Sequence, residues 1–254
     1  MSDLFSLDGQ VALVTGSSRG LGFAMAEALA AHGALAVLNG RDAATLEPRA
    51  RALRDRGYQA EAAAFDVTDG AAATMAVRAV TERHGRLDIL VNNAGIQHRV
   101  PLVEWADADW DRVITANLTA CFRLAREAAR VMLAQGSGRI INTGSVAAIL
   151  ARPTIHGYIA AKAGLHGLTR SMAAALGCHG ITVNAIAPGY FATEMNTPLL
   201  ADQEFTAWVE RRTPLGRWAE PEEIGGAVVF LASRAGAYVN GHVLAVDGGL
   251  SVTL

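Results

Sequence analysis

The fold is decided by the stretch from Gln10 to Gly22, which runs Gln-Val-Ala-Leu-Val-Thr-Gly-Ser-Ser-Arg-Gly-Leu-Gly. Its first six residues are mainly apolar and predict a short, buried parallel strand. A helical pattern from Phe23 to His32 ends at Gly33, and a second apolar run follows at 34–39. A strand, a glycine-rich turn, a helix and a strand within about thirty residues are typical of a dinucleotide-binding unit. In such a unit the helix N-terminus and the bare backbone amides bind a pyrophosphate.

The same alternation continues along the rest of the chain. Helices are expected at 42–56, 68–84, 109–135, about 158–178 and from Pro221, and strands at 59–65, 87–91, 139–142, 181–187 and 242–246. The pattern predicts one α/β domain over residues 1–254, a doubly wound (Rossmann) parallel sheet of seven strands with helices on both faces. The segment at about 190–218 is expected to be an irregular insert that forms a lid over the substrate. Alternatively, its aromatic residues belong to a subunit interface.

The end of the second strand, Asn39-Gly40-Arg41-Asp42, indicates the choice of cofactor. An acidic residue here would hold a ribose 2′-hydroxyl, whereas arginine accepts a 2′-phosphate. Arg41 and Arg19 both offer the fork geometry that suits phosphate, and Asp42 stands where the next helix needs an N-cap. The sequence therefore favours NADP(H), with NAD(H) as the alternative. A surface role for both arginines is also left open.

A second group of residues suggests proton-transfer chemistry. Ser145 follows a strand-like run, and Tyr158 and Lys162 lie four residues apart in a helical pattern, so they share one face. A free phenol ionises near pH ~10, and a neighbouring cation lowers that pKa. Asn117 lies in a helical segment where its amide is a poor helix former, which indicates either a back-bonding side chain or a water-holding kink.

Composition excludes several classes of function. The chain has 254 residues, 51% of them hydrophobic and 18% charged, and a net charge of −2, which gives no case for binding nucleic acid or an anionic membrane. Only two cysteines occur, no signal peptide is recognised at the N-terminus, and no apolar run is long enough to span a membrane. We expect a cytoplasmic protein without a disulfide framework. The seven histidines lack ligand spacing, so no metal is expected.

Taken together, these motifs resemble the short-chain dehydrogenase/reductase family over essentially the full length of the chain. The matching features are 15–22, 92–95, Asn117, Ser145, Tyr158 with Lys162, and 188–189. Within the family the chain is most similar to the bacterial gluconate 5-dehydrogenases, through segments 38–42, 94–99, 187–195 and 212–218. Residues 146–150 are apolar where that subgroup tends to be polar, which leaves room for a related polyol or ketone as substrate.

The resemblance implies a role for each candidate residue. Tyr158 would be the general acid/base, Lys162 would lower its pKa and hold the nicotinamide ribose, Ser145 would bind the reacting oxygen, and Asn117 would anchor a water. The implied cofactor residues are Gly16, Ser18, Arg19, Gly20, Leu21, Gly22, Asn39, Arg41, Asp66, Val67, Asn93, Ala94, Gly95, Tyr158, Lys162, Pro188, Gly189 and Thr193. For a sugar acid, Arg99 and Arg152 are the candidates for the carboxylate, and Gln97, His98 and His156 for hydroxyl groups; a solvated surface position is the alternative for each.

The leading hypothesis is an NADP(H)-dependent oxidoreductase that interconverts a ketone and a secondary alcohol, such as 5-keto-D-gluconate and D-gluconate or a related polyol. Two alternatives remain: a 3-oxoacyl-[acyl-carrier-protein] reductase, and a non-catalytic dinucleotide-binding sensor. The expected partner is a small molecule. The resemblance also implies a homotetramer with contacts through the last helix and residues 239–249.

Overall fold

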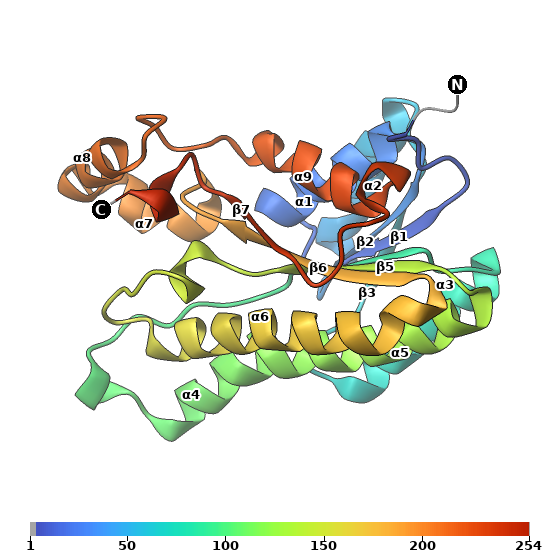
Figure 1. The fold of residues 1–254 in the computed structure, drawn as a ribbon, viewed down its shortest axis with the longest axis horizontal. Helices are drawn as coiled ribbons and strands as arrows, with labels where there is room; N and C mark the ends of the chain where they lie inside the picture. The colour runs from blue at the N-terminus through green and yellow to red at the C-terminus, as the bar shows by residue number, and fades with distance from the viewer. Residues whose placement is uncertain (1–3, 254) are drawn as a thin grey trace.

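The computed structural model describes residues 4–253, and these residues contain a seven-stranded parallel sheet (Figure 1). The strands are β1 (Val11–Val14), β2 (Leu35–Gly40), β3 (Ala60–Ala64), β4 (Ile89–Asn92), β5 (Gly138–Thr143), β6 (Ile181–Pro188) and β7 (Val243–Val246). Their spatial order is β3-β2-β1-β4-β5-β6-β7, so the direction of winding reverses between β1 and β4. Ligands of doubly wound sheets bind at such a reversal, beyond the carboxyl ends of the strands. The predicted fold class is confirmed.

Helices cover both faces of the sheet, and each face has its own hydrophobic core. Helices α1 (Gly20–Ala31), α2 (Ala43–Asp55) and α9 (Gly225–Ala232) pack on one face, and α3 (Gly70–His84), α5 (Ala120–Gln135) and α6 (His156–Leu176) on the other (Figure 1). Within β1, Ala12 and Val14 belong to the first core, whereas Val11 and Leu13 belong to the second. Because successive side chains of a strand point to opposite faces, this strand has to be apolar at every position.

Aspartate side chains begin two of the helices on the sheet. Asp42 accepts a hydrogen bond from the Ala44 amide (3.0 Å), as expected for the N-cap of α2. Helix α3 begins after Asp69, two residues later than the predicted start at Thr68. The Thr68 amide is instead bonded to the Asp66 carboxylate (2.8 Å), which holds this residue in a turn before the helix.

The helix expected at 109–135 is three elements rather than one. Helix α4 (Asp107–Ile114) passes into a π-helical turn, η2 (Thr115–Thr119), before α5 begins. Such a turn widens the helix locally and is frequent at functional sites. It includes Asn117, whose Nδ2 donates to the Val113 carbonyl four residues back, so the back-bonding alternative is present.

The segment at 190–218 is more regular than the sequence analysis expected. It contains α7 (Thr197–Leu200) and α8 (Gln203–Arg212), which lie beyond one end of the sheet (Figure 1). Pro198 lies in the first turn of α7, where proline is tolerated, and Asp202 caps α8 by accepting from the Phe205 amide (3.0 Å). The expectation of an irregular insert was therefore wrong, because Pro198 and Asp202 each start a helix in this segment.

Within residues 4–253 no helix is long and apolar enough to cross a membrane. The same residues include no group of three or more His, Cys, Asp or Glu side chains suited to a metal ion.

Candidate active site

A cavity of about 1700 Å³ lies along the carboxyl ends of the strands, at the reversal between β1 and β4. Pockets for a single small ligand usually occupy about 300–1,000 Å³, so this cavity has room for a dinucleotide and a substrate together. Every cofactor residue and every catalytic residue expected from the sequence lines it. Their roles remain predictions, but the structure brings them all to one place.

The glycine-rich turn between β1 and α1 forms one end of the cavity. Gly16 has φ +61°, and a Cβ placed on it would lie 2.8 Å from Cα of Ala94. A Cβ on Gly22 would overlap the carbonyl oxygen of Gly16 and the amide nitrogen of Asn93. The turn can therefore pack directly against the 92–95 loop only because these side chains are absent. This packing leaves bare backbone and the N-terminus of α1 facing the cavity, as a pyrophosphate requires.

The side chains of Asn39 and Asn93 connect the glycine-rich turn to neighbouring parts of the protein through hydrogen bonds. Asn39 is buried; its Oδ1 accepts from the Gly16 amide (3.2 Å), and its Nδ2 donates to the carbonyls of Ala63 and Phe65 (both 3.1 Å). Asn93 donates through Nδ2 to the carbonyls of Thr15 and Gly16 (both 3.0 Å). These bonds occupy the Asn39 amide, so it holds the glycine-rich turn beside the end of β3, and Asn39 lines the cavity as one of the expected cofactor residues.

Near the end of β2, the side chains that could bind a 2′-phosphate are arginines rather than Asp42. The Asp42 carboxylate accepts from the Thr45 hydroxyl (2.6 Å) and the Ala44 amide, and these bonds hold the pKa of Asp42 below its ordinary value. Arg41 lines the cavity, as does Arg19, whose Nη1 lies 2.7 Å from Oε2 of Glu194. Asp66, one of the expected cofactor residues, also lines the cavity; bonds from the Thr68 amide and hydroxyl lower its pKa.

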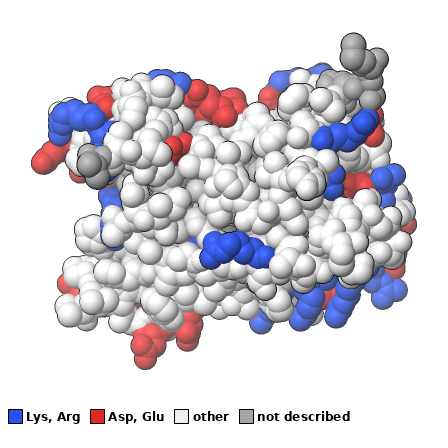
Figure 2. Space-filling view, in the orientation of Figure 1, with Lys and Arg blue, Asp and Glu red and all other residues white. Residues whose placement is uncertain are grey.

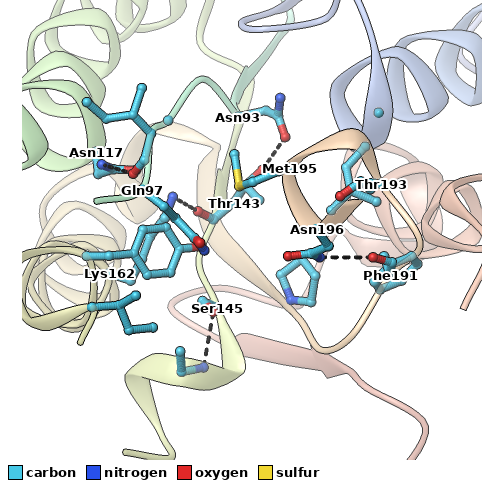
Figure 3. A pocket seen from close by; sticks show the side chains of 18 of the residues that line it. Asn93, Gln97, Asn117, Thr143, Ser145, Lys162, Phe191, Thr193, Met195 and Asn196 are labelled. Carbon is cyan, nitrogen blue, oxygen red and sulfur yellow. Dashed lines mark hydrogen bonds between the residues drawn. The ribbon is translucent and has the colours of Figure 1, made fainter. Parts of the chain in front are cut away.

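Ser145, Tyr158 and Lys162 meet at the middle of the cavity, beside the ends of β5 and β6. Lys162 is buried, and its Nζ donates to the Thr143 carbonyl (2.6 Å) and lies 5.6 Å from the centre of the Tyr158 ring. Ser145 immediately follows the turn after β5, and its Oγ accepts from the Ala147 amide (3.1 Å). Figure 3 shows Lys162 bonded to Thr143, with Ser145 beyond it on the same side of the cavity. An ammonium, a phenol and a hydroxyl thus face one space.

The π-helical turn presents Asn117 next to this group. Its Nδ2 donates to the carbonyls of Ile96 and Val113 (both 2.9 Å), whereas its Oδ1 is buried without a partner in the described part of the chain. A buried oxygen without a partner is uncommon and costs stability unless a water or ligand satisfies it. This geometry fits the expected role of Asn117 as the anchor of a water.

Residues from β6 and the following segment form the opposite wall. Pro188, Gly189 and Thr193, three of the expected cofactor residues, line the cavity here. Figure 3 shows Thr193, Met195 and Asn196 on the side facing Asn93 and Lys162. The Asn196 side chain donates to the Phe191 carbonyl (3.0 Å), which fixes the start of the 190–218 segment beside the site.

Two arginines mark the far end of the cavity. Arg99 donates to the side-chain oxygen of Gln97, and burial, reinforced by the nearby charge of Arg152, lowers the pKa of Arg99. Arg152 lies over the ring of Phe205, with Cζ 4.3 Å from the ring centre. Neither arginine forms an ion pair with a carboxylate of residues 4–253. This end of the cavity therefore concentrates positive charge that lacks a counter-ion.

The two candidate histidines lie elsewhere, contrary to expectation. Neither His98 nor His156 lines the cavity. Both rings pack edge-on against Trp105, with centres 5.0 and 6.3 Å away, and His98 also approaches Asp109 (3.5 Å). Packing around Trp105 turns them away from the substrate end.

The apolar segment at 146–150 has a packing role that accounts for part of its departure from the subgroup. Val146 is buried with Ala187 and Leu250, and Leu150 and Tyr190 pack against the same cluster. Ala147 and Leu150 also line the cavity. The segment therefore anchors the C-terminal part of the chain as well as forming a wall.

Several cavity-lining residues were not singled out from the sequence as ligand contacts. They are Arg112, Glu194, Met195, Asn196, Asp202, Glu204, Arg212 and Leu250. Most belong to the 190–218 segment, whose aromatic residues Phe205 and Trp208 were the available signal. Arg112, near the end of α4, carried no signal in the sequence.

Comparisons with known proteins agree with this geometry. A family model described as enoyl-(acyl carrier protein) reductase matches residues 16–251. The chain is 50% identical to the gluconate 5-dehydrogenase of Gluconobacter oxydans, over 99% of this chain and 98% of that one, and 44% identical to the 5-keto-D-gluconate 5-reductase of Escherichia coli over the full length of both. Among solved structures, a gluconate 5-dehydrogenase from Burkholderia cenocepacia in complex with NADP and tartrate is 46% identical, with a TM-score of 0.97 and 99% of each chain covered. With its doubly wound sheet, its glycine-rich turn and its Ser–Tyr–Lys group, the chain belongs to the short-chain dehydrogenase/reductase family.

Proposed function

We propose that the protein is an NADP(H)-dependent oxidoreductase that interconverts 5-keto-D-gluconate and D-gluconate by hydride transfer. The observation that carries this proposal is the pair of uncompensated arginines, Arg99 and Arg152, in the same cavity as Ser145, Tyr158 and Lys162. A carboxylate at one end of the substrate and a carbonyl at the other match this arrangement. Relatives with the same reaction in their names support the choice of substrate, and the NADP complex of the Burkholderia protein supports the cofactor.

Different parts of the cavity would bind different parts of the cofactor. The glycine-rich turn and the N-terminus of α1 would hold the pyrophosphate, Arg19 and Arg41 the 2′-phosphate, and 92–95 with Thr193 the nicotinamide half. Bound there, NADPH supplies a hydride from C4 of its nicotinamide. The protein would position the cofactor and the substrate, stabilise charge on the reacting oxygen and supply a proton.

The proton reaches the substrate from Tyr158. Its hydroxyl is the acid for ketone reduction and the base for alcohol oxidation, and Ser145 donates a hydrogen bond to the same substrate oxygen. Lys162, fixed by the Thr143 carbonyl, places its Nζ beside the Tyr158 ring, where it can stabilise negative charge that develops during proton transfer. Asn117 would hold a water through its unpartnered Oδ1 and connect Lys162 to solvent protons.

The substrate carboxylate pairs with Arg99 and Arg152. Both lie within the cavity rather than on an open basic face, whereas a reductase of acyl-carrier-protein substrates needs basic surface at the entrance for its acidic carrier. The position of the arginines therefore favours a small anionic substrate. The 190–218 segment, with Phe205 against Arg152, serves as the lid of a single catalytic domain.

The family resemblance also supports a proposal for the assembly and the location of the protein. A homotetramer would cover the largely uncharged face formed by α6 and the β7 region, which carries a basic cluster near its centre and other charged side chains mainly around its edge (Figure 2). Tyr238 and Val252 are fully or mostly exposed in the single chain, as residues of a subunit contact would be. We propose a cytoplasmic location, where NADPH is available.

A substrate panel tests the proposal. Initial rates are measured with NADPH and NADH on 5-keto-D-gluconate, an uncharged polyhydroxy ketone and an acetoacetyl thioester. We expect the highest kcat/KM for 5-keto-D-gluconate with NADPH. A preference for the thioester would support the acyl reductase instead, and no oxidation of either cofactor with any carbonyl would support a non-catalytic sensor.

A further inference from the structure

The ion pair between Arg19 and Glu194 joins two walls of the cavity that are far apart in the sequence. Arg19 directly precedes α1, and Glu194 begins the 3₁₀ turn η5 (Glu194–Asn196) that leads into α7. We propose that Glu194 holds Arg19 until a 2′-phosphate replaces it, and thereby limits the preference for phosphorylated dinucleotide and holds the lid in place until the phosphate binds. This inference rests on the proposed use of NADP(H).

The ion pair between Arg19 and Glu194 can be replaced by a pair between Arg19 and a phosphate. Nη1 of Arg19 lies 2.7 Å from Oε2 of Glu194, yet the two side chains are 68% and 58% exposed. Exposed ion pairs shift equilibria by only about two- to five-fold. A phosphate dianion is a stronger, bidentate partner for a guanidinium than one carboxylate is. Arg19 can therefore leave Glu194 for the phosphate at small cost.

The other charged groups at this end of the cavity leave Arg19 as the exchangeable cation. Asp42 is bonded to the first turn of α2 and is not available to a ribose hydroxyl. Arg41 lies close enough to Asp66 to lower the pKa of that carboxyl. A 2′-phosphate that binds here therefore encounters two arginines, each of which already has a carboxylate nearby: Arg41 has Asp66, and Arg19 has Glu194. Removing the charge of Glu194 frees one cation and removes one repulsive carboxylate.

The exchange would also act on the lid. Glu194 follows Thr193, whose side chain faces Gly20 of the glycine-rich turn, and precedes Met195 and Asn196, which line the cavity. The pair with Arg19 is the ion pair that the structure records between residues 190–218 and the glycine-rich turn, within the described residues. When the phosphate takes Arg19, the lid loses this tether and can adjust to the substrate. A dinucleotide without the phosphate leaves the tether in place.

The test uses two nucleotides that differ only in the 2′-phosphate, adenosine 2′,5′-bisphosphate and 5′-AMP. Their Kd values are measured calorimetrically for the wild type, Glu194→Gln and Glu204→Gln. Glu204 is the matched control because it lines the same cavity from α8 and the structure shows no ion pair for it among residues 4–253. We expect Glu194→Gln to bind the bisphosphate about two- to five-fold more tightly than the wild type does, with 5′-AMP unchanged, and Glu204→Gln to change neither Kd.

Hydrogen exchange of the backbone reports on the lid directly. In the wild type, the bisphosphate should raise exchange in residues 194–200 and 5′-AMP should not, whereas Glu194→Gln should show the raised exchange without ligand. If the bisphosphate binds more tightly than 5′-AMP by the same ratio in all three proteins, the role of Glu194 is overturned and the NADP(H) proposal stands. Weaker binding of the bisphosphate to Glu194→Gln also overturns it, because Glu194 would then orient Arg19 for the phosphate. If the wild type binds both nucleotides equally, the NADP(H) proposal fails, and the inference fails with it.

Discussion

Replacement of Arg99 by methionine tests how the cavity chooses its substrate. Arg99 is half-buried, bonded to Gln97 and close to the like charge of Arg152, and it has no carboxylate partner in residues 4–253. Methionine keeps most of the volume and removes the charge. A hydrogen bond to a charged group contributes about 1.5–3 kcal/mol, which corresponds to a loss of about 10- to 150-fold in kcat/KM. Arg152 still attracts the carboxylate, so we expect the lower half of this range.

The assay compares two ketones on the same protein. With NADPH saturating, kcat/KM for 5-keto-D-gluconate should fall in Arg99→Met, mainly through KM, while kcat/KM for an uncharged polyhydroxy ketone stays within about two-fold. Arg112→Met is the matched control: Arg112 lines the same cavity, but Asp109 already neutralises it. Equal losses on both ketones, or the same loss in Arg112→Met, would refute the argument that Arg99 recognises the carboxylate.

Three further predictions concern stability and cofactor binding. Burial lowers the pKa of His166 from 6.5 to about 4, so the unfolded chain takes up the proton first as pH falls. The free energy of unfolding should therefore drop by up to about 3 kcal/mol between pH 6.5 and 4. Urea titrations should show this pH dependence in the wild type, and His166→Leu should lack the contribution. Asn39→Leu removes the buried hydrogen bonds of Asn39 with the Gly16 amide and with the carbonyls of Ala63 and Phe65. The change should cost about 2–4 kcal/mol of unfolding free energy in urea. An unchanged midpoint would mean that water replaces the amide. Gly22→Ala should weaken binding of adenosine 2′,5′-bisphosphate at least about ten-fold, because the new Cβ pushes the glycine-rich turn away from the 92–95 loop. If calorimetry gives an unchanged Kd for the bisphosphate, the packing described for Gly22 is contradicted.

Local patterns carried the prediction of the fold. The apolar run before Gly16 and the aspartate at 42 act through their immediate neighbours, by strand burial and by an N-cap bond. Ser145, Tyr158 and Lys162 could be grouped for a similar reason, because one helix face and one strand end bring them together.

Side chains whose direction depends on distant partners could not be predicted in this way. Asn39 finds its partners at the end of β3 and in the glycine-rich turn, which no local spacing shows. His98 and His156 turn towards Trp105 rather than towards the substrate. Glu194 acquires its partner only because the chain returns to α1 some 175 residues after Arg19.

The central claim is that Tyr158 delivers the proton while the cavity holds NADPH. Stopped-flow measurement of NADPH oxidation with saturating 5-keto-D-gluconate, on the wild type and Tyr158→Phe, tests it most directly, with NADPH affinity measured in parallel by fluorescence. The account predicts that loss of the hydroxyl lowers the rate at least about 100-fold, while the Kd for NADPH stays within a few-fold. Oxidation of NADPH by Tyr158→Phe at the wild-type rate would contradict it.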